Sequence, residues 1–142
     1  MTTSLKEGMS VTRRITVTED RTIDFLTDAG ADNSTNRVYA TPSMIHDIET
    51  VCRDFLLDYI DDGLDSLGTH VDISHTAPTL LGMWAEITAT AAKVDGRAIS
   101  FAISACDQTG DKIADGRHDR FIIDVEKTRK RLAAKAAQAA GP

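Results

Sequence analysis

The chain has 142 residues, of which 42% are hydrophobic and 27% are charged, and this length suits one domain with a single core. Its formal net charge of −6 is uneven, because residues 1–126 hold all 22 acidic residues but only 11 of the 16 basic ones. The resulting charge of −11 on this part would repel nucleic acid, so we expect no nucleic-acid partner.

The first predicted element is a strand over residues 9–17, where apolar and polar side chains alternate. The next stretch, residues 20–37, is polar and rich in turn-forming residues, with few apolar residues to anchor it. This composition predicts a mobile loop or lid.

A long helix is predicted to follow, with Thr41 as its N-cap and Pro42 in its first turn. From Met44 to Ile60 the apolar residues recur with a helical period, and Asp61-Asp62-Gly63 then ends the pattern. The expected helix has about five turns.

Four strands are predicted after the helix, over residues 66–76, 83–94, 97–106 and 112–125. The sequence therefore predicts an α+β domain over residues 1–126, whose antiparallel sheet wraps around one long central helix. Residues 127–142 form a basic, Ala-rich tail that is a candidate for a terminal helix.

Two ionisable residues fall on faces that are otherwise apolar. Glu49 lies in the apolar stripe of the predicted helix, and His75 shares a strand face with Val71 and Ile73. Because burial of an unpaired charge costs several kcal/mol, we expect Glu49 and His75 to be covered and to share hydrogen bonds. A buried Glu/His pair indicates acid–base chemistry.

Other signals are absent from the sequence. The N-terminus has no signal-peptide core, and no segment approaches the ~20 apolar residues of a membrane span. Cys52 and Cys106 form no CxxC motif, and the four histidines lack metal-site spacing. We expect a cytoplasmic protein with reduced thiols, no membrane partner, no metal and no cofactor.

An ordered set of motifs resembles the fluoroacetyl-CoA thioesterase-like family of hot-dog proteins. The set is Thr41-Pro42, Glu49 eight residues after Thr41, Gly68-Thr69, His75 seven residues after Gly68, and the segment 116–121. The resemblance covers about residues 8–127. It implies a hot-dog fold, an acyl-CoA substrate, and a site built between the protomers of a homodimer or a higher oligomer.

The resemblance also implies roles for individual residues. Thr41, Glu49 and His75 match the family's catalytic residues, Gly68 matches the glycine beside the reacting carbonyl, and Arg120 falls in a segment near the substrate. Tyr39 is an aromatic residue close to the site, and we expect it to contact substrate. The rise of two helical turns argues against a direct bond between Thr41 and Glu49. An acyl-enzyme on Thr41, an anhydride on Glu49 and direct attack by water all stay open.

Simpler interpretations exist for the same residues. Thr41 could only cap the helix, Glu49 could pair with Arg53, His75 could be a core histidine, and Gly68 could serve an unusual backbone angle. Two other functions also fit the fold: an enoyl-CoA hydratase or dehydratase, and a non-catalytic acyl-CoA-binding or dimerisation module. Within this family, the enzyme specialised for fluoroacetyl-CoA has aromatic residues in the lid ahead of its threonine. The corresponding residues 33–37 are polar in this chain, so the resemblance does not imply fluoroacetyl specificity.

Overall fold

The computed structural model describes residues 3–29 and 35–141. The elements follow in the order β1 (Ser10–Thr16), η1 (Glu19–Arg21), β2 (Thr22–Ile23), β3 (Val38–Tyr39), α1 (Thr41–Leu57), β4 (Leu64–His75), β5 (Trp84–Asp95), β6 (Ala98–Asp107), β7 (Lys112–Asp124) and α2 (Val125–Ala140). One long helix is followed by four long strands, so the predicted α+β class is confirmed. The short elements η1, β2 and β3 lie where the sequence indicated only a loop or its border.

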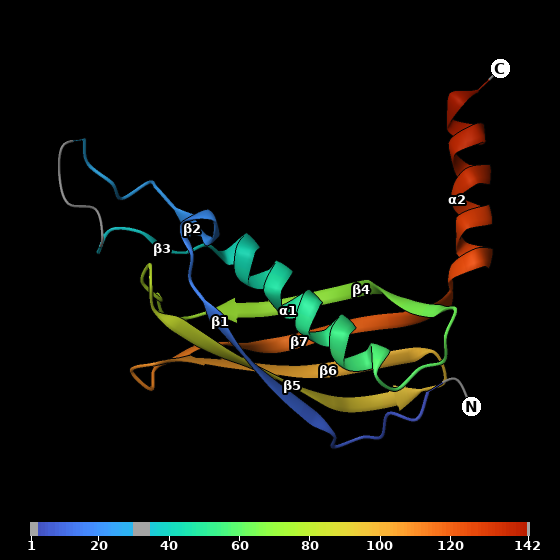
Figure 1. Cartoon of the computed structure of the whole chain (residues 1–142), viewed down its shortest axis with the longest axis horizontal. Helices are drawn as coiled ribbons and strands as arrows, with labels where there is room; N and C mark the ends of the chain where they lie inside the picture. Colours follow the sequence, from blue (N-terminus) through green and yellow to red (C-terminus); the bar gives the residue numbers. More distant parts are fainter. Residues whose placement is uncertain (1–2, 30–34, 142) are drawn as a thin grey trace.

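The main sheet has five antiparallel strands in the order β1-β5-β6-β7-β4, and α1 lies across one of its faces (Figure 1). Buried side chains alternate along β5 and β6, because successive residues of a strand point to opposite faces. The core between helix and sheet includes Met44, Ile48, Val51, Cys52, Phe55, Leu56, Ile87, Ile99, Phe101, Ile113 and Ile122. The sheet thus covers the apolar stripe of the helix as predicted.

The two ends of α1 differ from the prediction. Ala40 is the N-cap residue and its side chain makes no capping bond, so Thr41 is the first residue of the helix rather than its cap. At the other end α1 stops at Leu57, because the N–H groups of Asp58 and Tyr59 bond to carbonyls three residues back. The hydroxyl of Thr41 is therefore available for another partner.

β4 is an edge strand of the main sheet. In the described part of the chain it pairs with β7 on one side, and the register shifts between Gly68 and His70, which marks a bulge at Thr69. Leu67 is 52% exposed and Val71 is 43% exposed on this strand. A 12-residue edge with exposed apolar side chains can accept a further strand.

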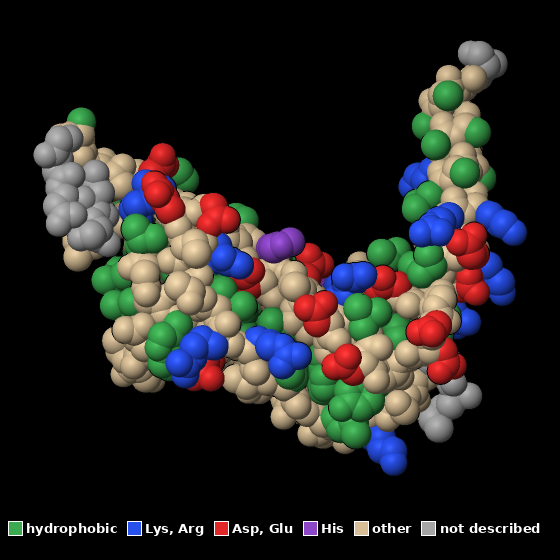
Figure 2. Space-filling view, in the orientation of Figure 1, with side chains coloured by type: hydrophobic (Ala, Val, Ile, Leu, Met, Phe, Trp, Pro, Cys, Tyr) green, Lys and Arg blue, Asp and Glu red, His purple; other side chains and the backbone are tan. Residues whose placement is uncertain are grey.

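Two segments project from the side of the sheet that α1 covers, at opposite ends of the molecule (Figures 1 and 2). One is the arm, defined here as residues 19–29 and 35–40. The predicted loop or lid at 20–37 falls largely on the arm, although its residues 30–34 lie outside the described residues. The other projection is α2, which begins at Val125, where the Asp124 carboxylate accepts a bond from Lys127 N. The division into a domain and a tail at residue 127 stays a prediction.

Neither helix in residues 3–29 and 35–141 combines the length and the apolar character needed to span a membrane.

Candidate active site

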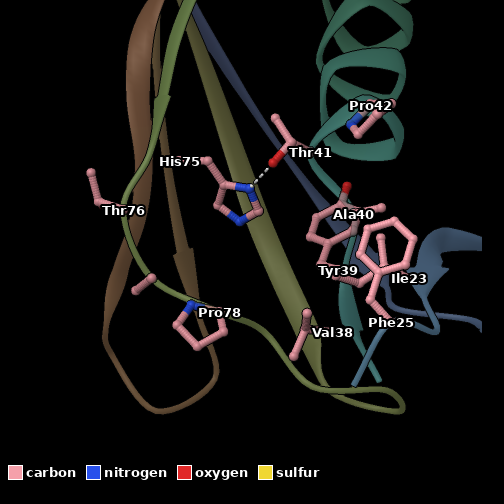
Figure 3. Close-up of a pocket in the computed structure, with 11 residues that line it drawn as sticks. Ile23, Phe25, Val38, Tyr39, Ala40, Thr41, Pro42, His75, Thr76 and Pro78 are labelled. Carbon is pink, nitrogen blue, oxygen red and sulfur yellow. Dashed lines mark hydrogen bonds between the residues drawn. The ribbon is translucent and has the colours of Figure 1, made fainter. Parts of the chain in front are cut away.

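Thr41 and His75 meet at one end of α1. Oγ1 of Thr41 lies 2.7 Å from Nδ1 of His75, and the close-up shows the two side chains pointing toward each other from the helix start and from the last residue of β4 (Figure 3). The interpretation of Thr41 as a mere helix cap is wrong, because its hydroxyl bonds the imidazole. An alcohol and a potential base are thus in direct contact.

The pair lies in the wall of a cavity of about 420 Å³. The lining residues come from the arm, the start of α1 and the end of β4: Ile23, Phe25, Val38, Tyr39, Ala40, Thr41, Pro42, His75, Thr76, Ala77 and Pro78 (Figure 3). Most of these side chains are apolar, so the wall of the cavity suits an apolar part of a ligand.

Burial lowers the pKa of His75 below its ordinary value of 6.5, and contact with the Ala77 backbone offsets part of this shift. The imidazole is therefore neutral at pH 7 and able to accept a proton. Nε2 is buried and has no hydrogen-bond partner among the described residues. The interpretation of His75 as a core histidine bonded only to backbone is wrong, since Nδ1 contacts a hydroxyl.

Tyr39 contributes its ring to the cavity wall but turns its hydroxyl away. The hydroxyl donates to the Asp47 carboxylate, which also accepts from Arg21 at 3.0 Å. Burial, followed by this hydrogen bond, raises the pKa of Tyr39 far above its ordinary value. Asp47 is 5% exposed, and sequence reasoning gave it no role. Its position among the apolar residues of the helical stripe could have indicated that Asp47 is buried and needs a partner.

A second group of polar side chains gathers around Glu49, two turns further along α1. Oε1 of Glu49 lies 4.0 Å from Nη1 of Arg120. A Cβ atom on Gly68 would be 2.6 Å from the same Oε1 and 3.1 Å from Cε1 of His118. Gly68 has no left-handed backbone angle, so the angle interpretation is wrong and close approach of the carboxylate explains the glycine.

Arg120 is 5% exposed and its orientation is fixed by three hydrogen bonds. Nε donates to Ser66 Oγ at 2.7 Å, Nη2 to the Ser66 carbonyl at 2.8 Å, and Nη1 to Nε2 of His118 at 3.1 Å. Because His118 accepts through Nε2, its Nδ1 carries the proton and donates to the His70 carbonyl at 2.8 Å. Neutral His118 thus positions the guanidinium beside Glu49.

The predicted hydrogen bond between Glu49 and His75 is absent within one chain. His75 bonds Thr41 through one nitrogen and has no partner on the other, whereas Glu49 lies beside Arg120. Glu49 is also less covered than expected, with 45% of its side chain exposed. The alternative pair with Arg53 is wrong as well, because Arg53 bonds Asp65 at 2.7 Å. One protomer therefore holds two separate groups, the Thr41 group (Thr41, His75) and the Glu49 group (Glu49, Gly68, His118, Arg120).

No cluster of three or more His, Cys, Asp or Glu side chains in the described ranges is arranged to hold a metal ion. The hydroxyl, imidazole and carboxylate of the two groups are suited to acid–base and nucleophilic chemistry.

The sequence and the fold are similar to known thioesterases. A family model described as fluoroacetyl-CoA-specific thioesterase matches residues 17–126. The fluoroacetyl-CoA thioesterase of Streptantibioticus cattleyicolor is 34% identical over 128 residues, which cover 87% of this chain and 91% of that enzyme.

Solved structures agree with this match. A fluoroacetyl-CoA thioesterase superposes with a TM-score of 0.80 at 30% identity, covering 93% of this chain and 98% of that one, and a variant of it was solved with fluoroacetate and CoA. A member of the thioesterase superfamily from Thermus thermophilus has a TM-score of 0.83 at 25% identity, covering 96% and 97% of the two chains. These similarities confirm the predicted hot-dog fold.

Proposed function

This chain belongs to the family of fluoroacetyl-CoA-specific thioesterases, and from this premise we propose that it hydrolyses small acyl-CoA thioesters to the free acid and CoA. The observation that carries the proposal is the 2.7 Å contact between Thr41 Oγ1 and His75 Nδ1 in the wall of an apolar cavity. A hydroxyl beside a neutral imidazole is the arrangement that nucleophilic attack on a carbonyl requires.

The acyl group is proposed to occupy the cavity beside Thr41. Its volume of about 420 Å³ must also hold the end of the pantetheine arm, so short acyl groups fit best. Residues 35–37 of the arm, Thr-Asn-Arg, are polar. We therefore propose a general preference for small acyl groups rather than a selective one for fluoroacetyl-CoA.

We propose that the Thr41 group of one protomer and the Glu49 group of the other form one site in a homodimer. The exposed edge of β4 supports this pairing, because two copies can join there antiparallel about a two-fold axis. With the axis near Val71 and Asp72, His75 of one chain would lie within about two residues of the partner's Gly68. Each dimer would then hold two complete sites.

Acylation is proposed to begin with the Thr41 hydroxyl. His75 Nδ1 accepts the hydroxyl proton while Oγ1 attacks the thioester carbonyl, and the C–S bond of the resulting intermediate breaks. The imidazolium returns its proton to the departing CoA thiolate. The products of this half-reaction are free CoA and an ester on Thr41.

Deacylation is assigned to the partner's Glu49. Its carboxylate accepts a proton from water, the water oxygen attacks the ester, and the proton returns to Thr41 Oγ1 when the C–O bond breaks. Nη1 of Arg120 lies 4.0 Å from Oε1 of Glu49 and helps to hold the carboxylate in place for this step. The free acid leaves and both side chains are restored.

Negative charge on the carbonyl oxygen can be stabilised at the start of α1. Ala40 is a poor N-cap residue and supplies no side-chain acceptor, so backbone N–H groups of the first turn are left without a side-chain cap. These donors and the positive end of the helix dipole suit an oxyanion at this position.

A panel of acyl-CoA esters assayed by release of free thiol tests the proposed function. Acetyl-, propionyl- and fluoroacetyl-CoA are expected to be hydrolysed faster than long-chain or aromatic esters. Loss of enoyl-CoA absorbance without thiol release would instead identify a hydratase. Tight binding of acyl-CoA without turnover, unchanged in Glu49→Gln, would identify a non-catalytic binding module.

We further propose a cytoplasmic location. The described cysteines, buried Cys52 and exposed Cys106, are both free thiols, which suits a reducing compartment.

A further inference from the structure

Large apolar side chains are exposed at three places on the described surface. Leu67, Val71 and Phe121 lie on or beside the β4 edge, Phe25 and Leu26 lie in the arm, and Leu132 lies on α2. The proposed dimer covers the first place. The other two places require a separate explanation.

Beyond its first turn, the apolar stripe of α2 is left uncovered by the described residues of one protomer. Val125, Leu132, Ala136 and Ala139 recur at helical spacing, Leu132 is 60% exposed, and none of the 16 residues is buried. Four basic side chains lie on the rest of the helix, namely Lys127, Lys130, Arg131 and Lys135. Arg129 falls at the spacing of the stripe and pairs with Glu126 at 2.7 Å. Because a lone helix of this length is marginally stable in water, we expect another apolar surface to pack on its stripe.

The arm presents a surface that complements α2. Phe25 is 83% exposed and Leu26 is 59% exposed, and acidic residues precede them at Glu19, Asp20 and Asp24. Phe25 also lines the cavity beside Thr41 (Figure 3). A partner that covered the arm would therefore cover the mouth of the acyl cavity.

The positions of the two projections explain how they can meet. The arm and α2 rise from the same side of the sheet at opposite ends of the molecule, as Figures 1 and 2 show. A two-fold axis perpendicular to the sheet at the β4 edge places the arm and α2 of the second protomer on the same side of the sheet as those of the first. The axis also exchanges the two ends of the molecule, so α2 of one protomer lies toward the arm of the other. Moreover, α2 follows directly after β7, and β7 pairs with the edge strand at Leu64 and Asp124. Antiparallel pairing of the edges brings this end close to residues 77–78 of the second chain, beside its cavity.

We propose that α2 of one protomer packs its apolar stripe on Phe25 and Leu26 of the other, so that each helix forms part of the entrance to its partner's acyl site. The inference rests on the dimer proposed above. Unlike charges on the two surfaces orient the contact, and the apolar side chains supply the buried area.

Site-directed cross-linking tests this contact. The full chain carries Cys106→Ser, to remove the exposed native thiol, together with Leu26→Cys and Ala136→Cys. A short bismaleimide should join two chains through these thiols. The matched control carries Ala134→Cys instead, because residue 134 lies on the same helix about 160° away from residue 136.

The expected result is a covalent dimer that forms at least about tenfold faster for position 136 than for position 134, since only one helix face meets the arm. Equal rates, or no covalent dimer, in a protein that sediments as a dimer and hydrolyses acyl-CoA would overturn the α2 contact and leave the proposed function intact. A protein that sediments as a monomer would overturn both the contact and the proposed composite site.

Discussion

Oε1 of Glu49 lies 2.6 Å from the position that a Cβ atom on Gly68 would occupy. The carboxylate thus approaches the backbone of β4 closely, and His118 Cε1 and Arg120 Nη1 lie 3.1 and 3.5 Å from the same Cβ position. Any side chain at position 68 would move the carboxylate. The position of the proposed base therefore depends on a glycine at this point of β4.

Gly68→Ala is expected to lower kcat/KM by about tenfold to a hundredfold, because it displaces a proposed base from its position. The melting temperature should change little, since Gly68 has an ordinary backbone angle and the clashing atom is the end of a flexible side chain. Thiol-release kinetics and thermal unfolding measure the two effects. Gly68→Ala combined with Glu49→Asp should lose less activity than the product of the two single changes, and strictly multiplicative losses would argue against the steric account.

Thr41→Val should reduce kcat by at least about a hundredfold while Thr41→Ser retains most of it, because only the hydroxyl carries the proposed chemistry. Thr50→Val is a matched control on the same helix, where the hydroxyl only bonds the His46 carbonyl at 3.0 Å. Mass measurement after mixing with a slowly hydrolysed thioester should show an acyl adduct on Thr41 in the native protein. An adduct on Glu49, or a fully active Thr41→Val protein, would contradict the assigned nucleophile.

Tyr39→Phe should destabilise the protein by about 1–3 kcal/mol, because it removes a buried donor from the Asp47 carboxylate. Urea unfolding gives this free energy. The aromatic ring that lines the cavity is kept, so KM for acetyl-CoA should change less than about threefold. A large rise in KM with unchanged stability would contradict this account, because it would show that the hydroxyl of Tyr39 contacts substrate.

Stability should depend on pH through His118. Burial, assisted by the charge of Arg120, lowers its pKa below 6.5 in the folded state, and the bond to the His70 carbonyl opposes this shift. The unfolded chain then binds more protons just below pH 6.5, so stability is full above that pH and falls as the pH drops toward the folded pKa. His75 acts in the same direction.

Urea unfolding between pH 8 and pH 5 measures this slope. His118→Gln should flatten the slope, whatever its effect on absolute stability, whereas exposed His46→Gln should leave it unchanged. An identical slope in all three proteins would show that His118 does not carry the dependence.

The sequence was sufficient to predict the main elements, because α1 and the long strands bury one regular face each. The helix ends were less accurate: Thr41-Pro42 is a good starting signal, yet the hydroxyl of Thr41 serves His75 rather than the helix. Of the residues matched to the family motif, Thr41 and His75 contact each other, whereas the predicted bond between Glu49 and His75 is absent within one chain. Hydrophobic periodicity reports which face is covered and contains no information on contacts between separate chains.

The partly buried network of Arg21, Asp47 and Tyr39 was missed for a related reason. Its members are 26 and 8 residues apart along the chain, and no local pattern links them. A buried acid requires a partner, but only the fold identifies that partner.

In the proposed dimer, each site combines Thr41 and His75 of one protomer with Glu49 of the other. Complementation between two inactive variants, Thr41→Val and Glu49→Gln, tests this arrangement. When the two chains are co-expressed equally, half of the dimers are mixed and each mixed dimer has one complete site, so about a quarter of native activity should return. Activity no higher than that of the two variants alone, in dimers shown to be mixed, would contradict the composite site.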